Sequence, residues 1–207
     1  MRSRTRRQRL PSTPRSTDVG RTATAALLAC LALGTGCRPA LPDLGAVPPF
    51  ALTDRSGASV SERDLDGHVW IADFVFTHCP DFCPALTARM AHLQATLPAD
   101  HDPVRLVSIT VDPVRDTPDV LDGYARQVGA RPEWLFLTGA RDAVAALLRD
   151  GFRVAFADDG PPDSPITHSD RFVLVDRHRR IRGYYHGTEP EDVDRLARDA
   201  VGLRAER

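Results

Sequence analysis

Lysine is absent from this sequence of 207 residues, and all 27 basic residues are arginine. The absence excludes any catalytic lysine. Cysteine is scarce, with four in the chain. Long apolar runs are missing too, because the stretch from Ala23 to Leu33 falls well short of the roughly 20 apolar residues that span a bilayer. The apolar share of 42% is nevertheless ordinary for a globular protein with a full core.

Acidic residues are in excess over most of the chain, although the whole sequence has a net charge of only −1. Residues 1–36 hold seven arginines and one acid, Asp18, so the remainder carries a net charge of −7. Nucleic-acid binding depends on basic groups that neutralise phosphates, so an acidic body argues against a nucleic-acid partner. The length predicts one domain with appendages, and the basic end is better explained by targeting.

The N-terminus has the order of a secretory signal. Arginine-rich residues 1–21 precede the apolar run, which ends in Gly34-Thr35-Gly36-Cys37. Small residues before a cysteine are typical of bacterial lipoprotein signals, although Gly34 stands where an aliphatic residue is usual. We expect a signal peptide over 1–36, acylation of Cys37, and a lipid-anchored location on the outer face of the cytoplasmic membrane. Plain cleavage and an uncleaved anchor are the alternatives.

A proline-rich linker is expected over residues 37–49, because four prolines fall within 38–49. In a polyproline conformation it would span roughly 35 Å. A domain over 50–207 follows. If Cys37 is acylated, the mature chain keeps two thiols, Cys79 and Cys83, and an exported pair meets oxidising conditions.

The remaining pattern predicts a thioredoxin-like α/β fold, with a central mixed sheet, flanking helices, and a C-terminal hairpin followed by a helix. Continuous apolar runs rich in β-branched residues indicate buried parallel strands, and apolar residues at helical spacing alternate with them. The expected strands are 50–54, 69–77, 106–111, 134–137, 172–176 and 181–185. One expected helix has Pro84 in its first turn and continues to Leu97, and a second follows the N-cap Thr117. Two more are expected over 144–148 and 191–200.

This fold brings distant residues to one edge of the sheet. Sites in open α/β sheets form beyond the carboxyl ends of the parallel strands. Cys79 follows one such end and Asp112 follows another, while His168 precedes a strand that begins at the same edge. We therefore expect these three residues to lie near one another.

The chemistry at this edge favours a soft metal. Cys79 and Cys83 cross a strand-to-helix turn, and a helix N-terminus lowers the pKa of a thiol placed there. Thiolates together with an imidazole suit Cu(I) and can hold Cu(II). A closed zinc site needs four ligands, and the pattern offers three.

Three motifs in this order resemble the Sco/SenC family over about residues 50–196. They are His78-Cys-Pro-Asp-Phe-Cys-Pro84, Val111-Asp-Pro-Val-Arg-Asp-Thr-Pro118, and His168 ahead of Phe172-Val-Leu-Val-Asp176. The resemblance implies a thioredoxin-like fold and one copper ion per domain, bound by Cys79, Cys83 and His168. It also implies a role in maturing the binuclear copper centre of cytochrome c oxidase. The expected partners are the oxidase subunit that carries this copper site and a copper donor. Thr167 and Arg179 depart from the family, which often has Asp and Gly there.

Other interpretations of these residues stay open. The two cysteines alone are compatible with a structural disulfide. His78 is a less favoured ligand, because its position next to Cys79 in the sequence directs its side chain away from the metal site. Asp112 is either an acceptor behind the metal ligands or a turn residue at a strand end. The leading function is a copper metallochaperone. The alternative is a thiol-disulfide oxidoreductase that keeps the oxidase cysteines reduced, although thioredoxin motifs have two residues between their cysteines and this one has three. A peroxidase is the third, and it gives His168 no role.

Overall fold

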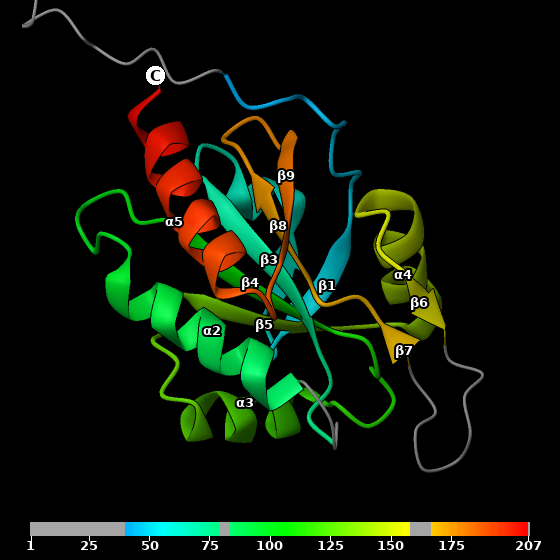
Figure 1. Cartoon of the computed structure of the whole chain (residues 1–207). Coiled ribbons are helices and arrows are strands. Elements are labelled where there is room, and N and C mark those ends of the chain that lie inside the picture. The colour runs from blue at the N-terminus through cyan, green and yellow to red at the C-terminus, as the bar shows by residue number, and fades with distance from the viewer. Residues whose placement is uncertain (1–39, 79–82, 158–166, 207) are drawn as a thin grey trace, which may run out of the picture. The chain divides into compact units, whose positions relative to one another are not determined.

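The computed structural model describes residues 40–78, 83–157 and 167–206, with only the main chain at 83, 156, 157 and 167 (Figure 1). Its strands are β1 (Ala51–Asp54), β2 (Ser59–Ser61), β3 (Trp70–Val75), β4 (Arg105–Thr110), β5 (Trp134–Thr138), β6 (Phe156–Ala157), β7 (Thr167–His168), β8 (Arg171–Val175) and β9 (Ile181–His186). Its helices are α2 (Cys83–Thr96), α3 (Pro118–Gln127), α4 (Arg141–Ala146) and α5 (Pro190–Ala205), with a 3₁₀ turn at Glu62–Leu65 and a π turn at Leu147–Gly151.

Seven strands form one mixed sheet in the order β2-β1-β5-β4-β3-β8-β9. The neighbours β3, β4 and β5 run parallel, whereas β1 and β8 flank them in the antiparallel sense. The pair β6 and β7 forms a separate small sheet. The mixed α/β sheet, its flanking helices, and the final hairpin and helix confirm the predicted architecture.

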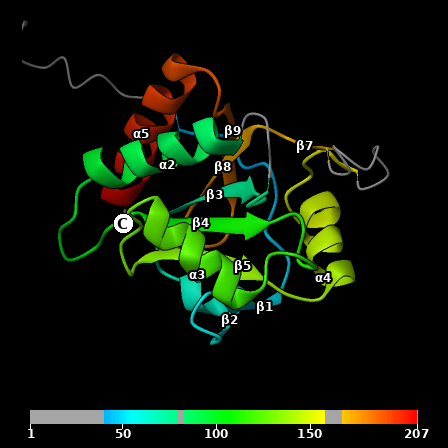
Figure 2. The ribbon, with the colours of Figure 1, turned by 90° about the horizontal axis from the view of Figure 1, so that it is seen from below.

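The central strands are buried on both faces, which explains their continuous apolar sequences. All six residues of β3 and five of the six in β4 are buried. Helices α2, α3 and α5 cover one face, and α4 with its π turn covers the other (Figures 1 and 2). Two hydrophobic layers, one on each side of the sheet, therefore hold the strand ends in place.

The proline-rich segment joins the packed body from Leu41 onward. The amides of Leu44 and Val47 donate to carbonyls of β9 and of the turn before it, at 2.9 Å each. Arg182 donates to the carbonyls of Leu41 and Pro42, and Val47 is 2% exposed. Residues 41–47, expected within an extended spacer, thus lie along the β8–β9 hairpin.

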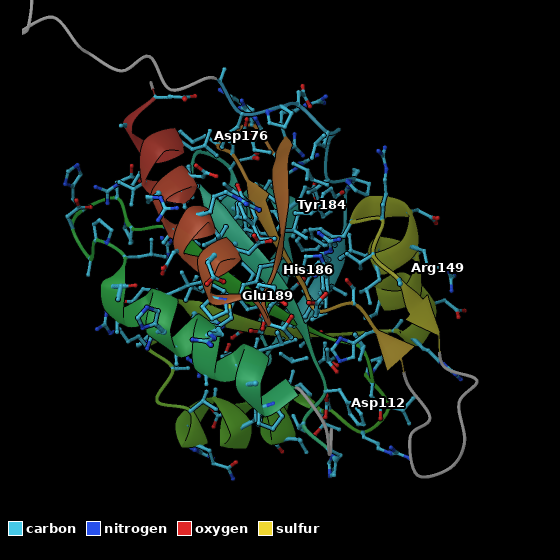
Figure 3. The ribbon with its side chains drawn as sticks, viewed as in Figure 1. Asp112, Arg149, Asp176, Tyr184, His186 and Glu189 are labelled. Carbon is cyan, nitrogen blue, oxygen red and sulfur yellow. The ribbon has the colours of Figure 1, made fainter. Side chains whose placement is uncertain are left out.

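The turn between β8 and β9 lies far from the end of β4. Asp176, in this turn, lies at the opposite end of the sheet from Asp112 (Figure 3).

None of the helices in the described part of the chain has both the length and the apolar character needed to cross a membrane.

Candidate metal centre

The predicted site residues that the structure describes, Cys83, Asp112 and His168, fall at the carboxyl end of the parallel strands. Strand β3 ends at Val75, β4 ends at Thr110, and Asp112 follows two residues later. The first turn of α2, which begins at Cys83, and strand β7 with His168 lie at this same end of the sheet (Figure 1). Cys79 and Cys37 lie outside the described residues, and Cys83 is described by its main chain alone.

His168 is held as a buried neutral imidazole. The residue is 6% exposed, and its Nδ1 lies 3.0 Å from the carbonyl oxygen of Ser169. A carbonyl accepts only, so Nδ1 carries the proton and the lone pair of the ring stands at Nε2. Burial lowers the pKa of His168, an effect partly offset by the Ser169 carbonyl and the charge of Asp170. A neutral imidazole whose orientation is fixed by a main-chain carbonyl is the usual form of a histidine that binds metal.

Asp112 is 7% exposed and begins the loop after β4. Its amide donates to Thr110 Oγ1 at 2.9 Å, and its Oδ1 accepts a long bond of 3.4 Å from the Arg115 amide. Its Oδ2 is buried and accepts no hydrogen bond from the described residues, with the Arg115 guanidinium 3.5 Å away. Oδ1 therefore stabilises the turn after β4. A role for Oδ2 as a hydrogen-bond acceptor behind the metal ligands stays a prediction.

Asp116 is the functional candidate that the sequence reasoning did not single out. Its carboxylate is fully buried and accepts hydrogen bonds from two strand ends. Thr77 Oγ1 donates to Oδ1 at 2.5 Å and the Thr77 amide to Oδ2 at 3.2 Å, while Thr110 Oγ1 donates to Oδ2 at 2.6 Å. The residue lies inside the Val111–Pro118 motif. An acidic side chain between the polar residues Arg115 and Thr117 was the only sequence feature that could have indicated its role.

His78 lies on the outside of this arrangement. Its side chain is 61% exposed, with Nδ1 at 2.9 Å from Thr77 Oγ1 and 4.0 Å from Asp116 Oδ1. Among the described side chains, no group of three or more His, Cys, Asp or Glu is arranged to hold a metal ion. The two thiols of the expected ligand set belong to side chains beyond that description. The buried neutral His168 fits the third position of a thiolate and imidazole donor set for copper.

Comparison with known proteins identifies the family. The SCO1/SenC family model matches residues 41–201, and the chain belongs to this family. A structure of BsSco, described as a member of the Sco family of cytochrome c oxidase assembly proteins with a disulfide switch, is 30% identical, covers 82% of this chain and all of its own, and has a TM-score of 0.72.

Two further solved structures are similar. A SCO1/SenC family lipoprotein from Bacillus anthracis str. Ames is 29% identical over 78% of this chain and 96% of its own, with a TM-score of 0.69. ScoI of Bradyrhizobium japonicum with copper bound is 27% identical over 77% of this chain and 99% of its own, with a TM-score of 0.66. These matches confirm the Sco/SenC resemblance and the thioredoxin-like fold.

Proposed function

We propose that this chain is an exported copper-binding protein that delivers copper to, or matures, the binuclear copper site of cytochrome c oxidase. Cys79, Cys83 and His168 bind one copper ion as cargo, as Cu(I) or Cu(II). The observation that carries the proposal is the buried imidazole of His168, whose Nδ1 lies 3.0 Å from a main-chain carbonyl and whose pKa is lowered by burial. In this arrangement Nε2 would be the atom that binds copper. Support comes from the copper-bound relative of Bradyrhizobium japonicum and from the cytochrome c oxidase assembly role printed for BsSco.

The second candidate is a thiol-disulfide oxidoreductase that acts on the cysteines of the oxidase copper site. The disulfide switch described for BsSco favours it. In this reaction a thiolate of the pair attacks the partner disulfide, the mixed disulfide forms, and the second cysteine then releases the reduced partner. The partner gains two electrons, and the chain leaves as the Cys79–Cys83 disulfide. Copper binding and this disulfide exclude each other, because both use the same two sulfurs.

The substitution His168→Ala separates the two functions. Imidazole contributes little to dithiol exchange, so the Cys79–Cys83 reduction potential should stay within about 30 mV of wild type. Loss of a ligand should weaken Cu(II) binding by more than the roughly 10- to 100-fold typical of groups behind the ligands. His178→Ala, an exposed histidine at the far end of the sheet, is the control. Copper titration of the reduced protein and redox titration measure both effects, and normal copper binding with impaired exchange would reverse the assignment.

We further propose that the chain is held on the outer face of the cytoplasmic membrane through lipid on Cys37. The signal-like order of residues 1–36 supports this location, and the lipoprotein from Bacillus anthracis is a relative. Intact-mass analysis of the native protein should show a chain that begins at an acylated Cys37. A mature chain with a different start and a free Cys37 thiol would contradict it. A single acyl chain binds membranes only marginally, so stable anchoring requires two or more.

A further inference from the structure

The strongest feature that the proposed function leaves unexplained is the buried carboxylate of Asp116. A carboxylate removed from water is costly unless hydrogen bonds replace its hydration. Asp116 receives three such bonds, two from Thr77 and one from Thr110. Thr110 is the last residue of β4 and Thr77 lies two residues after the end of β3. One side chain therefore joins the chain at the ends of two neighbouring strands. Charge-assisted bonds of this kind are about twice as strong as neutral ones.

Both strands lead directly into the site. Thr77 stands two residues before Cys79, and the bond from its amide fixes main chain as well as side chain. Thr110 stands two residues before Asp112, and its hydroxyl also accepts the Asp112 amide at 2.9 Å. The Asp116 amide in turn donates to the Asp112 carbonyl at 2.9 Å, which closes the loop on itself. The start of the cysteine segment and Asp112 are therefore set relative to each other through Asp116.

We propose that Asp116 is a positioning residue of the copper and thiol site. It acts through Thr77 on the main chain that carries Cys79, and through Thr110 on Asp112. The inference rests on the proposed role of Cys79 and Cys83, and it extends that role to a residue that touches neither copper nor sulfur. Loss of the carboxylate should change the geometry of bound copper and the balance between the dithiol and the disulfide.

The test uses variants that keep side-chain size. Asp116→Asn keeps the shape and removes the charge, whereas Thr77→Val and Thr110→Val each remove one donor. Thr138→Val is the matched control, because Thr138 is the last residue of the neighbouring strand β5 and is 4% exposed. Its hydroxyl has no hydrogen-bond partner among the described residues, so the same change there removes no such bond.

We expect all three site variants to change the Cu(II) electron paramagnetic resonance and absorption spectra of the full-length protein. We also expect Cu(II) affinity to fall about tenfold or more, as is typical of groups that orient metal ligands. The equilibrium of the Cys79–Cys83 couple with glutathione should shift by more than tenfold, which corresponds to more than about 30 mV. Thr138→Val should leave the spectra, affinity and potential at wild-type values.

Two measurements keep the outcome decisive. Thermal unfolding followed by circular dichroism shows whether each variant is folded at the temperature of the measurements. If Asp116→Asn does not fold, Thr77→Val and Thr110→Val provide the test. Wild-type spectra and potential in folded Thr77→Val and Thr110→Val would overturn the positioning role, even with a lowered melting temperature. Failure of the wild-type protein to bind copper would instead count against the proposed function, while the glutathione equilibrium would still report on Asp116.

Discussion

Asp73, in the middle of β3, is an acidic residue in the hydrophobic core. The residue is fully buried, and its Oδ1 accepts a hydrogen bond from Ser108 Oγ at 2.5 Å. Trp134 Nε1 donates to the same Ser108 oxygen at 2.9 Å, whereas Asp73 Oδ2 has no hydrogen-bond partner among the described residues. Burial raises the pKa of Asp73 to about 7, against the smaller opposing effect of the Ser108 bond. The folded protein therefore holds a proton on Asp73 in mildly acidic solution.

This raised pKa predicts a stability that falls as pH increases. The folded state binds more protons at Asp73 than the unfolded state, in which the pKa has its ordinary value of 3.8. Stability from this group is complete below about pH 4 and is lost as pH rises through about 7, at up to ~1.4 kcal/mol per pH unit. Asp73→Asn is neutral throughout. We compare the free energies of unfolding of wild type and Asp73→Asn. The wild-type value minus the variant value should fall by roughly 3 kcal/mol between pH 5 and pH 8.

Urea denaturation of both proteins across this range, with the cysteines kept reduced, measures the difference. Comparison with Asp73→Asn removes the contributions of all other titrating groups, which the two proteins share. Parallel stability curves for wild type and variant would show that Asp73 is ionised at pH 5 in the folded protein.

Elements differ in how far the sequence alone could predict them. Strands β3 and β4 were predictable because continuous apolar runs describe strands buried on both faces. The two-residue strands β6 and β7 were not, because main-chain pairing of that length leaves no pattern in side chains. The π turn after α4 is equally invisible, since it continues the helical spacing of α4.

The site shows the same division. His168 and Asp112 were singled out from their motifs and from the expected edge of the sheet. In the structure Asp112 follows the end of β4 and His168 lies in β7, just before β8. Asp116 was missed because its importance lies in bonds to Thr77, a residue 39 positions away. Local sequence reports which residues are polar, but long-range packing decides which of them become buried. The positive backbone angle at Arg179, φ 61°, explains why glycine is common at that turn position in the family.

Two glycines in different elements should respond oppositely to alanine. Gly187, just after β9, is buried, and an added Cβ would lie 2.6 Å from Leu86 and 2.8 Å from Phe172, both in the core. Gly187→Ala should lower the free energy of unfolding by about 1–3 kcal/mol through overpacking. Gly123 lies within α3 with nothing within 4 Å of an added Cβ. Gly123→Ala should raise the free energy of unfolding by up to about 1 kcal/mol, because alanine favours helix.

Denaturant titration of the two reduced variants beside wild type checks both signs. Because the chemical change is the same, unequal results reflect the surroundings of each position. A neutral Gly187→Ala would mean that Leu86 and Phe172 can move apart without cost.

At the scale of the whole molecule, the question is where the domain begins. Composition predicts that the chain is a spacer up to residue 49, whereas Leu44, Gly45 and Val47 exchange main-chain hydrogen bonds with the β8–β9 hairpin. Arg180 also pairs with the Asp43 carboxylate at 2.8 Å. If Cys37 carries lipid as proposed, residues 38–40 give the tether a reach of about 10 Å rather than the roughly 35 Å expected from composition.

Removal of residues 41–49 should therefore destabilise the domain. A chain that starts at Phe50 loses the bonds to Arg179 and Ile181 and exposes the core surface that Val47 covers. Burial of a valine alone contributes about 1.5 kcal/mol or more, so we expect a loss of about 2 kcal/mol relative to a chain that starts at Leu41. Urea denaturation of reduced 41–207 and 50–207 measures it, with 38–207 as the control that should match 41–207. Equal stability of 41–207 and 50–207 would mean that the segment is a spacer in solution, whereas destabilisation of 50–207 alone would make residues 41–49 part of the folded domain.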